Sequence, residues 1–419
     1  MAAVAAVPFA NEVPSEAAQL RRGLRRGERR RTLLAFALIA PLVLFLLANF
    51  VAPIGLLLGR AFTENEIPAA WPTTAHALLE WDGHGLPPPA LMSGFLVELA
   101  ATRGTPALSA AASRLNYEQP GSRSLLYATA AALPLAGDSD PLAGLTAIDV
   151  RWADRGTWAM MRRAAQGLST FYLLAAFDRR LDAAGGIQQV PESQAIFVTV
   201  LARTLWISAV VALVCALLGY PLAYVMARLP DRVARIGLIL VLLPFWTSVL
   251  VRTSAWMVVL QEHGLVNDAL LAAGWIAEPL ELIYNRTGLY IAMTHVLLPY
   301  FVLPLYSVMK RVPALTVRAA LSLGASPLQA FWRVYFPQTL SGTAAGALIV
   351  FILALGYYVT PALVGGADDQ MISYFIALYT NQSLNWGMAA ALSLVLLVAT
   401  VLLLLVHGRL AGRRELALR

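Results

Sequence analysis

Six apolar stretches, each long enough to cross a lipid bilayer as a helix, constrain this chain more than any other feature. They cover residues 33–58, 196–227, 236–258, 288–309, 342–364 and 386–407. A helix needs about 20 apolar residues to cross the hydrocarbon layer, and no acidic residue falls inside any of the six. Only 13% of the 419 residues are charged, against about 25% in soluble domains. The sequence therefore predicts an all-α, polytopic membrane protein with six transmembrane helices.

The arginines predict the orientation of these helices. With six crossings, the basic segments all fall on one side: residues 21–31, 228–235, 310–340 and the C-terminal tail. On the opposite side, the loop 259–287 holds only Arg286 and the loop 365–385 holds no basic residue. Because basic loops stay in the cytoplasm, both termini are predicted to be cytoplasmic. Membrane orientation thus accounts for the basic residues behind the net charge of +7. We therefore expect no nucleic-acid partner.

The expected organisation has five parts. These are a basic cytoplasmic tail (1–32), a first transmembrane helix (33–61), an extracytoplasmic helical insert (62–190), a membrane core of five transmembrane helices with a cytoplasmic loop (191–410) and a cytoplasmic tail (411–419). The first apolar run is too long for the core of a signal peptide, so we expect it to be retained.

The insert is predicted to be helical and to have a small core of its own. Thr105-Pro106 and Asp140-Pro141 have the form of helix starts, with a capping side chain followed by a first-turn proline. Gly167 has the form of a helix end. We find no catalytic constellation in this segment, so an accessory or docking role is the simpler interpretation.

The chemistry of the remaining residues excludes several functions. Cys215 is the only cysteine, so no intramolecular disulfide can form. Lys310 is the only lysine, and the residues around it do not form a phosphate-binding loop. The five histidines are too scattered for a metal site, and His295 is expected to be a hydrogen-bonded packing residue. We therefore expect no catalytic residues, no metal and no cofactor. Proton- and sodium-coupled carriers use ionisable groups deep in the membrane. The lack of acidic residues in the six apolar stretches therefore weakens the hypothesis that this chain is an ion-coupled carrier.

One segment, "RAALSLGASPLQAFWRVYFPQ" at 318–338, interrupts the spans on the predicted cytoplasmic side. Thr316 is placed to cap a first helix and Gly324 to end it in a left-handed conformation. Ser326 followed by Pro327 predicts the start of a second helix, and Pro337 is expected to mark its end. Two interpretations stay open at this point. The segment is either a docking element for a partner or an amphipathic helix lying on lipid.

The longer segment "RAALSLGASPLQAFWRVYFPQTLSGTAAG" resembles the EAA loop of the permeases of ABC importers. The matching positions are Ala319, Ala320, Gly324, Ala325, Phe331, Pro337, Gly342 and Gly346, while Arg318 stands in place of the usual glutamate. The flanking segments, among them "RTLWISAVVALVCALLGYPLAYVMARLP" and "GYYVTPALVGG", are similar to the spermidine/putrescine branch of that family. The resemblance covers about 33–60 and 195–410, and the insert lies outside it.

The resemblance implies a type I importer permease fold, ATP-driven import of polyamines and a place in a bacterial inner membrane. It implies a heterodimer with a second permease, two cytoplasmic ATPase subunits that bind the ATP, and an extracytoplasmic solute-binding protein. Residues 314–337 would be the coupling helix, seated in the ATPase through Arg318, Ala319, Ala320, Leu321, Leu323, Gly324, Ala325 and Pro337. Another small solute, such as an opine or an amino acid, is the alternative within the class. An ion-coupled secondary transporter is the alternative from outside it.

Candidates along the translocation path are aromatic, because an ammonium group over a ring face is stabilised by about 0.5–2 kcal/mol. They are Trp246, Trp256, Tyr300, Tyr357 and Tyr358, although each taken alone fits a packing or interfacial position. Arg252 is expected to be structural or gating, and either to reach outward or to pair with Asp368 or Asp369. Gly356, Pro361, Gly365 and Gly366 predict that the fifth span ends in a distorted segment, a candidate gate.

Overall fold

The structure is a computed structural model that describes residues 34–134, 140–182, 185–192 and 194–417, with side chains up to residue 409. The basic tail expected at 1–32 lies outside the described residues. The chain divides into two units, which meet between Leu57 and Leu58, and we describe each by itself.

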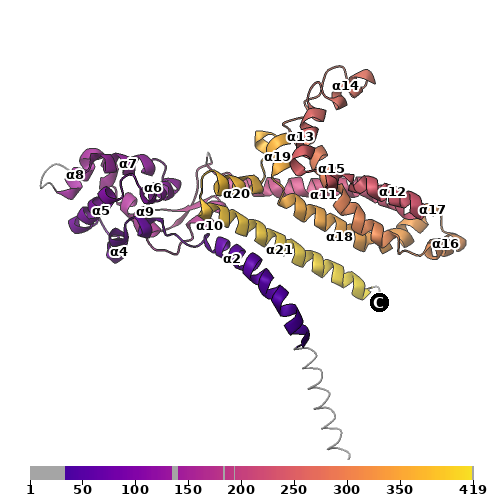
Figure 1. Cartoon of the computed structure of the whole chain (residues 1–419), viewed down its shortest axis with the longest axis horizontal. Coiled ribbons are helices and arrows are strands. Elements are labelled where there is room, and N and C mark those ends of the chain that lie inside the picture. Colours follow the sequence, from indigo (N-terminus) through magenta and orange to yellow (C-terminus); the bar gives the residue numbers. More distant parts are fainter. Residues whose placement is uncertain (1–33, 135–139, 183–184, 193, 418–419) are drawn as a thin grey trace, which may run out of the picture. The chain divides into compact units, whose positions relative to one another are not determined.

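The first unit is a single apolar helix. It runs from Leu34 to Gly59 as a candidate membrane span and includes a π turn, η1 (Leu47–Val51), followed by α2 (Ala52–Gly59), the indigo helix of Figure 1. None of the residues of η1 or α2 is buried. Because an apolar helix of this length is suited to lipid, it fits the first predicted span.

The second unit begins with the insert, which is helical apart from one short hairpin. Its elements are α3 (Glu66–Ala70), α4 (Pro72–Glu80), α5 (Pro89–Ala101), α6 (Pro106–Glu118), α7 (Ser122–Ala132), α8 (Pro141–Ile148), η2 (Val150–Ala153), α9 (Arg155–Ala164), α10 (Phe171–Ala176), β1 (Arg179–Leu181) and β2 (Ile187–Gln189). The two strands pair antiparallel, with Arg179 opposite Gln189. The helical prediction missed this hairpin.

The predicted helix starts of the insert are confirmed. The Thr105 hydroxyl accepts from the Leu108 amide at the start of α6, and Asp140 accepts from the Leu142 amide at the start of α8. Gly167 has a left-handed φ of +72°, but α9 ends at Ala164, so the glycine turns the chain after the helix and does not cap it directly.

Large aromatic side chains form the core of the insert. Trp71, Phe95, Trp152 and Trp158 are all fully buried, and the Phe95 ring lies 5.2–5.7 Å from the three indole rings. Such pairs add about 0.5–1.5 kcal/mol each beyond the area they bury. This cluster is separate from the cores of the membrane helices, so the insert has a core of its own, as predicted.

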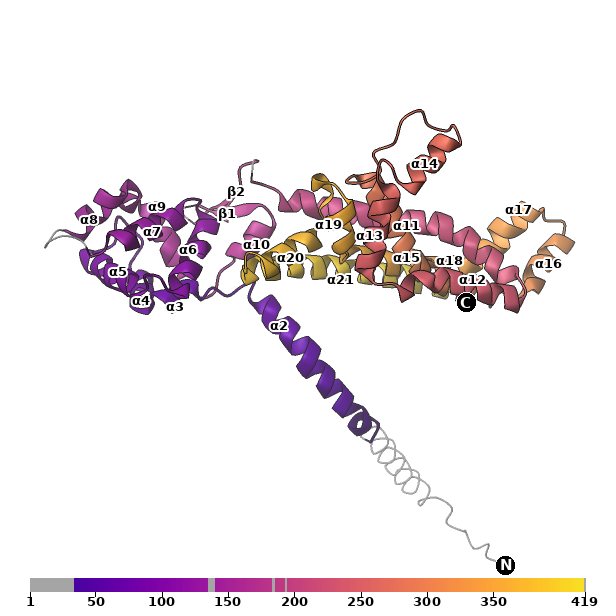
Figure 2. The ribbon, with the colours of Figure 1, turned by 45° about the horizontal axis from the view of Figure 1, so that its top comes forward.

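The remainder of the second unit is helical throughout the described residues (Figures 1 and 2). Its elements are α11 (Phe197–Arg228), α12 (Asp231–Leu242), η3 (Leu243–Trp246), α13 (Val249–Leu260), α14 (Leu265–Ala272), α15 (Arg286–Met309), α16 (Ala314–Ser322), α17 (Pro327–Ala330), η4 (Phe331–Tyr335), α18 (Phe336–Leu355), α19 (Val359–Val364), η5 (Ala367–Asp369), α20 (Ile372–Asn381) and α21 (Trp386–Ala417).

Helices α11, α15 and α18 pack closely around Phe301 of α15. A Cβ atom at Gly219 of α11 would lie 2.5 Å from the Phe301 ring, and one at Gly346 of α18 would lie 2.8 Å from the Phe301 carbonyl oxygen. Small residues at helix contacts let backbones approach in a membrane, where van der Waals packing drives association. These two glycines therefore set the spacing of the three helices.

The third predicted span, at 236–258, is broken by a bend. The described residues contain five helices long and apolar enough to cross, and a sixth crossing only if α12–η3 and α13–α14 count as one, although they bend by 98°. Pro244 lies in the 3₁₀ turn at the bend, and Ser248 caps α13 by accepting from the Val251 amide. Because a proline and a capping serine end one helix and start another, the bend is local in origin.

The fifth predicted span is shifted. A continuous helical run extends from Pro327 to Leu355, so Pro337 does not end a helix as we expected. The π turn η4 ends two residues before Pro337. Proline has no backbone N–H to donate, and a π turn changes the hydrogen-bond register of the helix at this point. The run stops at Leu355, and the separate helix α19 begins at Val359, in agreement with the predicted distortion.

Candidate functional site

The predicted coupling loop folds as two short helices around a left-handed glycine. Gly324 has a φ of +90°, and no atom lies within 4 Å of a Cβ built there. The Ser326 hydroxyl accepts from the Gln329 amide at 3.3 Å, and the Gln329 side chain accepts from the Ser326 amide at 3.1 Å. Thr316 does not cap α16 as predicted. Pro313 occupies the N-cap position without a side-chain capping hydrogen bond, and the Thr316 hydroxyl donates to the Pro313 carbonyl.

The exposed surface of this loop is mainly apolar and carries two cations, Arg318 and Arg333. Leu315, Leu323 and Leu328 are 74%, 88% and 68% exposed. Arg318 is exposed and has no ion pair in the part of the chain that the structure describes. Of the other predicted contact residues, Ala319, Leu321, Gly324 and Pro337 are exposed, and Ala320 and Ala325 are half-buried. Such an apolar surface fits either a partner or lipid.

An aromatic cluster joins this loop to α11. The rings of Phe331 and Tyr335 lie 5.6 and 5.3 Å from the ring of Tyr224, and the Arg228 guanidinium lies 3.9 Å above that ring. The Tyr220 hydroxyl lies 2.9 Å from the Thr339 hydroxyl. Our sequence analysis missed Tyr220, Tyr224 and Arg228. Their i, i+4 spacing places them on one helix face, which was the available signal.

Arg252 secures the break in the third span. It is buried, and its guanidinium donates to the carbonyl oxygens of Pro244 and Thr247 and to the Thr247 hydroxyl. Because a helix end leaves carbonyls without partners, the arginine satisfies them at the bend. It neither reaches outward nor pairs with Asp368 or Asp369, and its structural interpretation is favoured.

The candidate path aromatics do not converge on one site. Trp246 is 77% exposed and Tyr358 is also exposed. The Tyr300 ring packs 4.8 Å from the Phe245 ring, and the Trp256 indole donates to Nδ1 of His295 at 3.1 Å. His295 is therefore hydrogen-bonded, as predicted.

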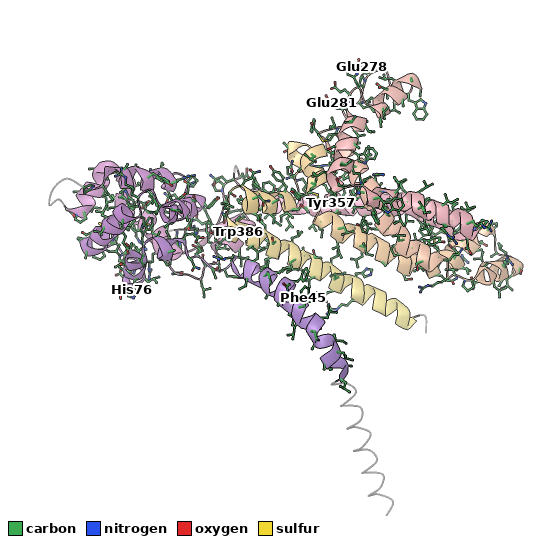
Figure 3. The ribbon with its side chains drawn as sticks, in the orientation of Figure 1. Phe45, His76, Glu278, Glu281, Tyr357 and Trp386 are labelled. Carbon is green, nitrogen blue, oxygen red and sulfur yellow. The ribbon has the colours of Figure 1, made fainter. Side chains whose placement is uncertain are left out.

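Two further candidates lie around α19. The carbonyl of Tyr357, labelled in Figure 3, accepts from the Ser373 hydroxyl at 2.6 Å. Pro361 is buried within α19. Tyr357 thus lies in the break between α18 and α19, and Pro361 lies just after it; the role of all these candidates on a path stays a prediction.

A polar cluster that our sequence analysis did not assemble lies beside α19. Asp369 pairs with Arg286 at 2.8 Å, and the carbonyl of Asp368 accepts from the Arg203 guanidinium. The four residues come from three distant parts of the sequence, although each lies near the end of a predicted span. We call Arg203, Arg286, Asp368 and Asp369 the Asp369 cluster.

The end of the insert is fastened to the membrane helices. Tyr172 of α10 is buried against Gly387, where an added Cβ would lie 2.2 Å from the tyrosine ring. The carboxylate of Asp178 accepts from the amides of Ile196, Phe197 and Val198 and so caps α11. Both contacts use the chain between the insert core and the first helix of the membrane core, so the insert is held at its exit.

No group of three or more His, Cys, Asp or Glu side chains that could hold a metal occurs among the described residues. The described site thus offers hydrogen bonds, ion pairs and an exposed apolar loop. These features suit binding and movement.

The comparisons with known proteins agree with this architecture. Residues 219–415 match the family described as "Binding-protein-dependent transport system inner membrane component". The spermidine/putrescine transport system permease protein PotB of Escherichia coli K12 is 35% identical over 214 residues, which is 51% of this chain and 78% of PotB. The molybdenum transport system permease protein ModB of Mycobacterium bovis is 30% identical over 219 residues, covering 52% of this chain and 80% of ModB.

Among solved structures, a bacterial alginate ABC transporter in complex with an alginate-bound periplasmic protein matches with a TM-score of 0.43 at 16% identity. That match covers 52% of this chain and 78% of the other.

The chain belongs to the family of binding-protein-dependent transport system inner membrane components, the permeases of ABC importers. Within it the chain aligns with the spermidine/putrescine permeases. It is a multi-pass protein of the inner membrane. The family match covers residues 219–415 and does not include the insert.

Proposed function

We propose that this chain is one permease subunit of an ATP-driven importer for polyamines. The observation that carries the proposal is the 35% identity to the spermidine/putrescine permease PotB over 214 residues. The described spans hold no acidic side chain that could bind a coupling ion, in keeping with an external source of energy. Because ModB is also similar to this chain, another small solute is the alternative that a substrate screen must address.

The proposed partners are a second permease, a cytoplasmic ATPase dimer and an extracytoplasmic solute-binding protein. The ATPase would bind the ATP, and this chain needs no cofactor of its own. A loaded binding protein makes transport directional because it binds the two states of the permease unequally. The alternating-access step therefore rests on movement of the membrane helices, delivered from the ATPase.

We propose that α16, α17 and the turn at Gly324 receive this movement. The exposed leucines would fill an apolar cleft of the ATPase, and the aromatic cluster around Tyr224 would transmit the displacement to α11. The docking interpretation is preferred over lipid because the rigid turn and capping box hold the exposed residues in fixed positions, as pre-organised binding requires.

The substitution Gly324→Val tests this role. Because the space around Gly324 is empty, the change acts through the left-handed backbone alone, at a cost of about 1–2 kcal/mol. We expect ATPase co-purification and uptake to fall while the chain still inserts. Gly274→Val is the matched control, since Gly274 also has a positive φ and open space. Equal loss in both variants, or none in either, contradicts the proposal.

The orientation, with the insert outside and both termini inside, is tested by thiol labelling. Ser122 is buried and unsuitable for a label, whereas Ser124 in the same helix is exposed. We expect Ser124→Cys, in a Cys215→Ala background, to react with a membrane-impermeant reagent in intact spheroplasts. Labelling seen only after lysis would mean that the insert lies in the cytoplasm and would contradict the proposed orientation.

Reconstitution tests the source of energy and the substrate. The chain alone in vesicles should neither hydrolyse ATP nor accumulate spermidine. Addition of the second permease, the ATPase and loaded binding protein should start uptake that stops when ATP is withdrawn. Accumulation driven by a proton or sodium gradient in vesicles with this chain alone would support the secondary-transporter alternative. Melting shifts of the binding protein with polyamines, opines and amino acids separate the substrates.

A further inference from the structure

The segment between α19 and α20 is bound to the start of α15 by closely spaced contacts. The Tyr284 amide donates to the Val364 carbonyl at 2.8 Å. A Cβ at Gly366 would lie 2.6 Å from the Tyr284 carbonyl oxygen, so only glycine permits this approach. Two residues after Tyr284 and three residues after Gly366, Nε of Arg286 donates to Oδ1 of Asp369 at 2.8 Å.

The same segment is also bound to the start of α11. The Arg203 guanidinium donates to the Asp368 carbonyl, and the Ile372 amide donates to the Thr204 hydroxyl at 2.9 Å. Residues 364–372 therefore join the N-terminal parts of α11 and α15, two membrane helices that lie far apart in the sequence.

Hydrogen bonds also close the base of this segment. The Ser373 hydroxyl donates to the Tyr357 carbonyl at 2.6 Å, and the hydroxyls of Thr253 and Thr360 lie 3.1 Å apart. Thr253 belongs to α13, the helix that follows the break secured by Arg252. Thr360 precedes the segment within α19, and Val364 of the segment shares a buried cluster with Leu260 of α13, so a displacement of residues 364–372 would reach α13 as well as α11 and α15.

The ion pair at the centre of the segment is suited to reversible separation. The Asp369 side chain is 7% exposed, whereas that of Arg286 is 47% exposed, so water can replace the carboxylate around the arginine.

We infer that residues 364–372 are a latch that holds the extracytoplasmic ends of α11, α13 and α15 together, and that the Arg286–Asp369 pair sets how readily the latch opens. Arg286 and Asp369 are positioning residues in this role and do not contact the substrate. The inference rests on the proposed alternating-access function and orientation.

The test measures opening directly. Thr360 is fully buried, so a cysteine placed there, in a Cys215→Ala background, reports on opening through its reaction with an impermeant thiol reagent. Asp369→Asn keeps the shape of the side chain and removes its charge. We expect the labelling rate, and the ATP hydrolysis of the assembled complex without binding protein, to rise about fivefold, the low end of typical conformational coupling. Glu281→Gln, which removes a nearby exposed charge outside the cluster, should change neither rate.

A charge exchange separates a latch from a merely structural contact. Arg286→Asp combined with Asp369→Arg should return the labelling rate to within about twofold of the parent, as expected if the pair itself is the determinant. Unchanged labelling in Asp369→Asn, or no recovery in the exchange, overturns the inference. Labelling needs no polyamine, so a failure to import polyamines would count against the proposed substrate and leave the latch result standing.

Discussion

The insert and the membrane core use opposite arrangements of charge. In the insert, one network of charges is buried and paired. Arg114 is buried between Glu64 at 2.7 Å and Glu118 at 3.1 Å, and Arg163 donates to Glu118 at 2.6 Å. The two glutamates outweigh the effect of burial, which by itself lowers the pKa of Arg114, so the pKa lies above its ordinary value. The guanidinium also lies 3.8 Å above the Phe171 ring.

In the membrane core the described spans are lined on the outside by leucine and valine, and the polar contacts lie at breaks and ends. Leu217, near the middle of α11, is 65% exposed, whereas Arg252 and the Asp369 cluster occupy the bend and the segment after α19. The difference shows that apolar surface follows the same rule in lipid and in water: it avoids contact with water. Apolar surface faces lipid, but in water it must be buried around a core.

The largest effect is expected from a substitution that breaks the buried ion-pair network of the insert. Arg114→Met leaves Glu64 and Glu118 without their cation, and loss of one partner of a buried pair costs about 3–5 kcal/mol. Hydrogen exchange in the full chain should show loss of protection in α6 and α9 with the membrane helices unchanged. Arg123→Met, at an exposed arginine, is the control and should change nothing. Loss of protection in both regions would mean that the insert is not a separate folding unit.

The second prediction places the same charged side chain on a lipid-facing and on a water-facing surface. Leu217→Lys places a charge in the lipid-facing part of α11, at a cost of about 2.5–3.5 kcal/mol, and should lower the amount of chain recovered in the membrane. Val97, in the insert, is 70% exposed, so Val97→Lys should be tolerated. Equal recovery of the two variants would contradict the proposed division between lipid and water.

The third prediction makes the same substitution in both regions. Gly346→Ala brings a methyl group against the Phe301 backbone, and overpacking of this kind costs about 1–3 kcal/mol. Gly94→Ala in α5 meets no atom within 4 Å, and should stabilise the insert by about 0.5 kcal/mol through the unfolded chain. Thermal unfolding in detergent measures both. Destabilisation by the two variants alike would remove the distinction between close helix packing and an open helix surface.

The smallest effect concerns acid. Hydrogen bonds from the Arg151 side chain hold the pKa of Asp149 at about 2, below its ordinary value of 3.8. A lowered pKa stabilises the folded state above pH 3.8, and the contribution is lost as the pH falls through about 2. The pair is partly exposed, so we expect about 0.5 kcal/mol or less. Urea unfolding of the insert at pH 6 and pH 3 should show a smaller difference for Asp149→Asn than for the parent.

The sequence by itself determined the class, the all-α fold and the family. Long acid-free apolar stretches leave helices in lipid as the only arrangement that satisfies the backbone. The turn at Gly324 and the cap at Ser326 were predictable because glycine conformation and serine capping are local properties. The caps at Thr105 and Asp140 were predictable for the same reason.

Only the tertiary structure decided which distant residues meet. The pairing of Asp369 with Arg286 depends on how α15 and the segment after α19 lie together. Pro337 stayed within a helix because a π turn precedes it. Hydrogen bonds and ion pairs act over about 3 Å, so the spacing of residues along a sequence does not reveal which ones come within that distance.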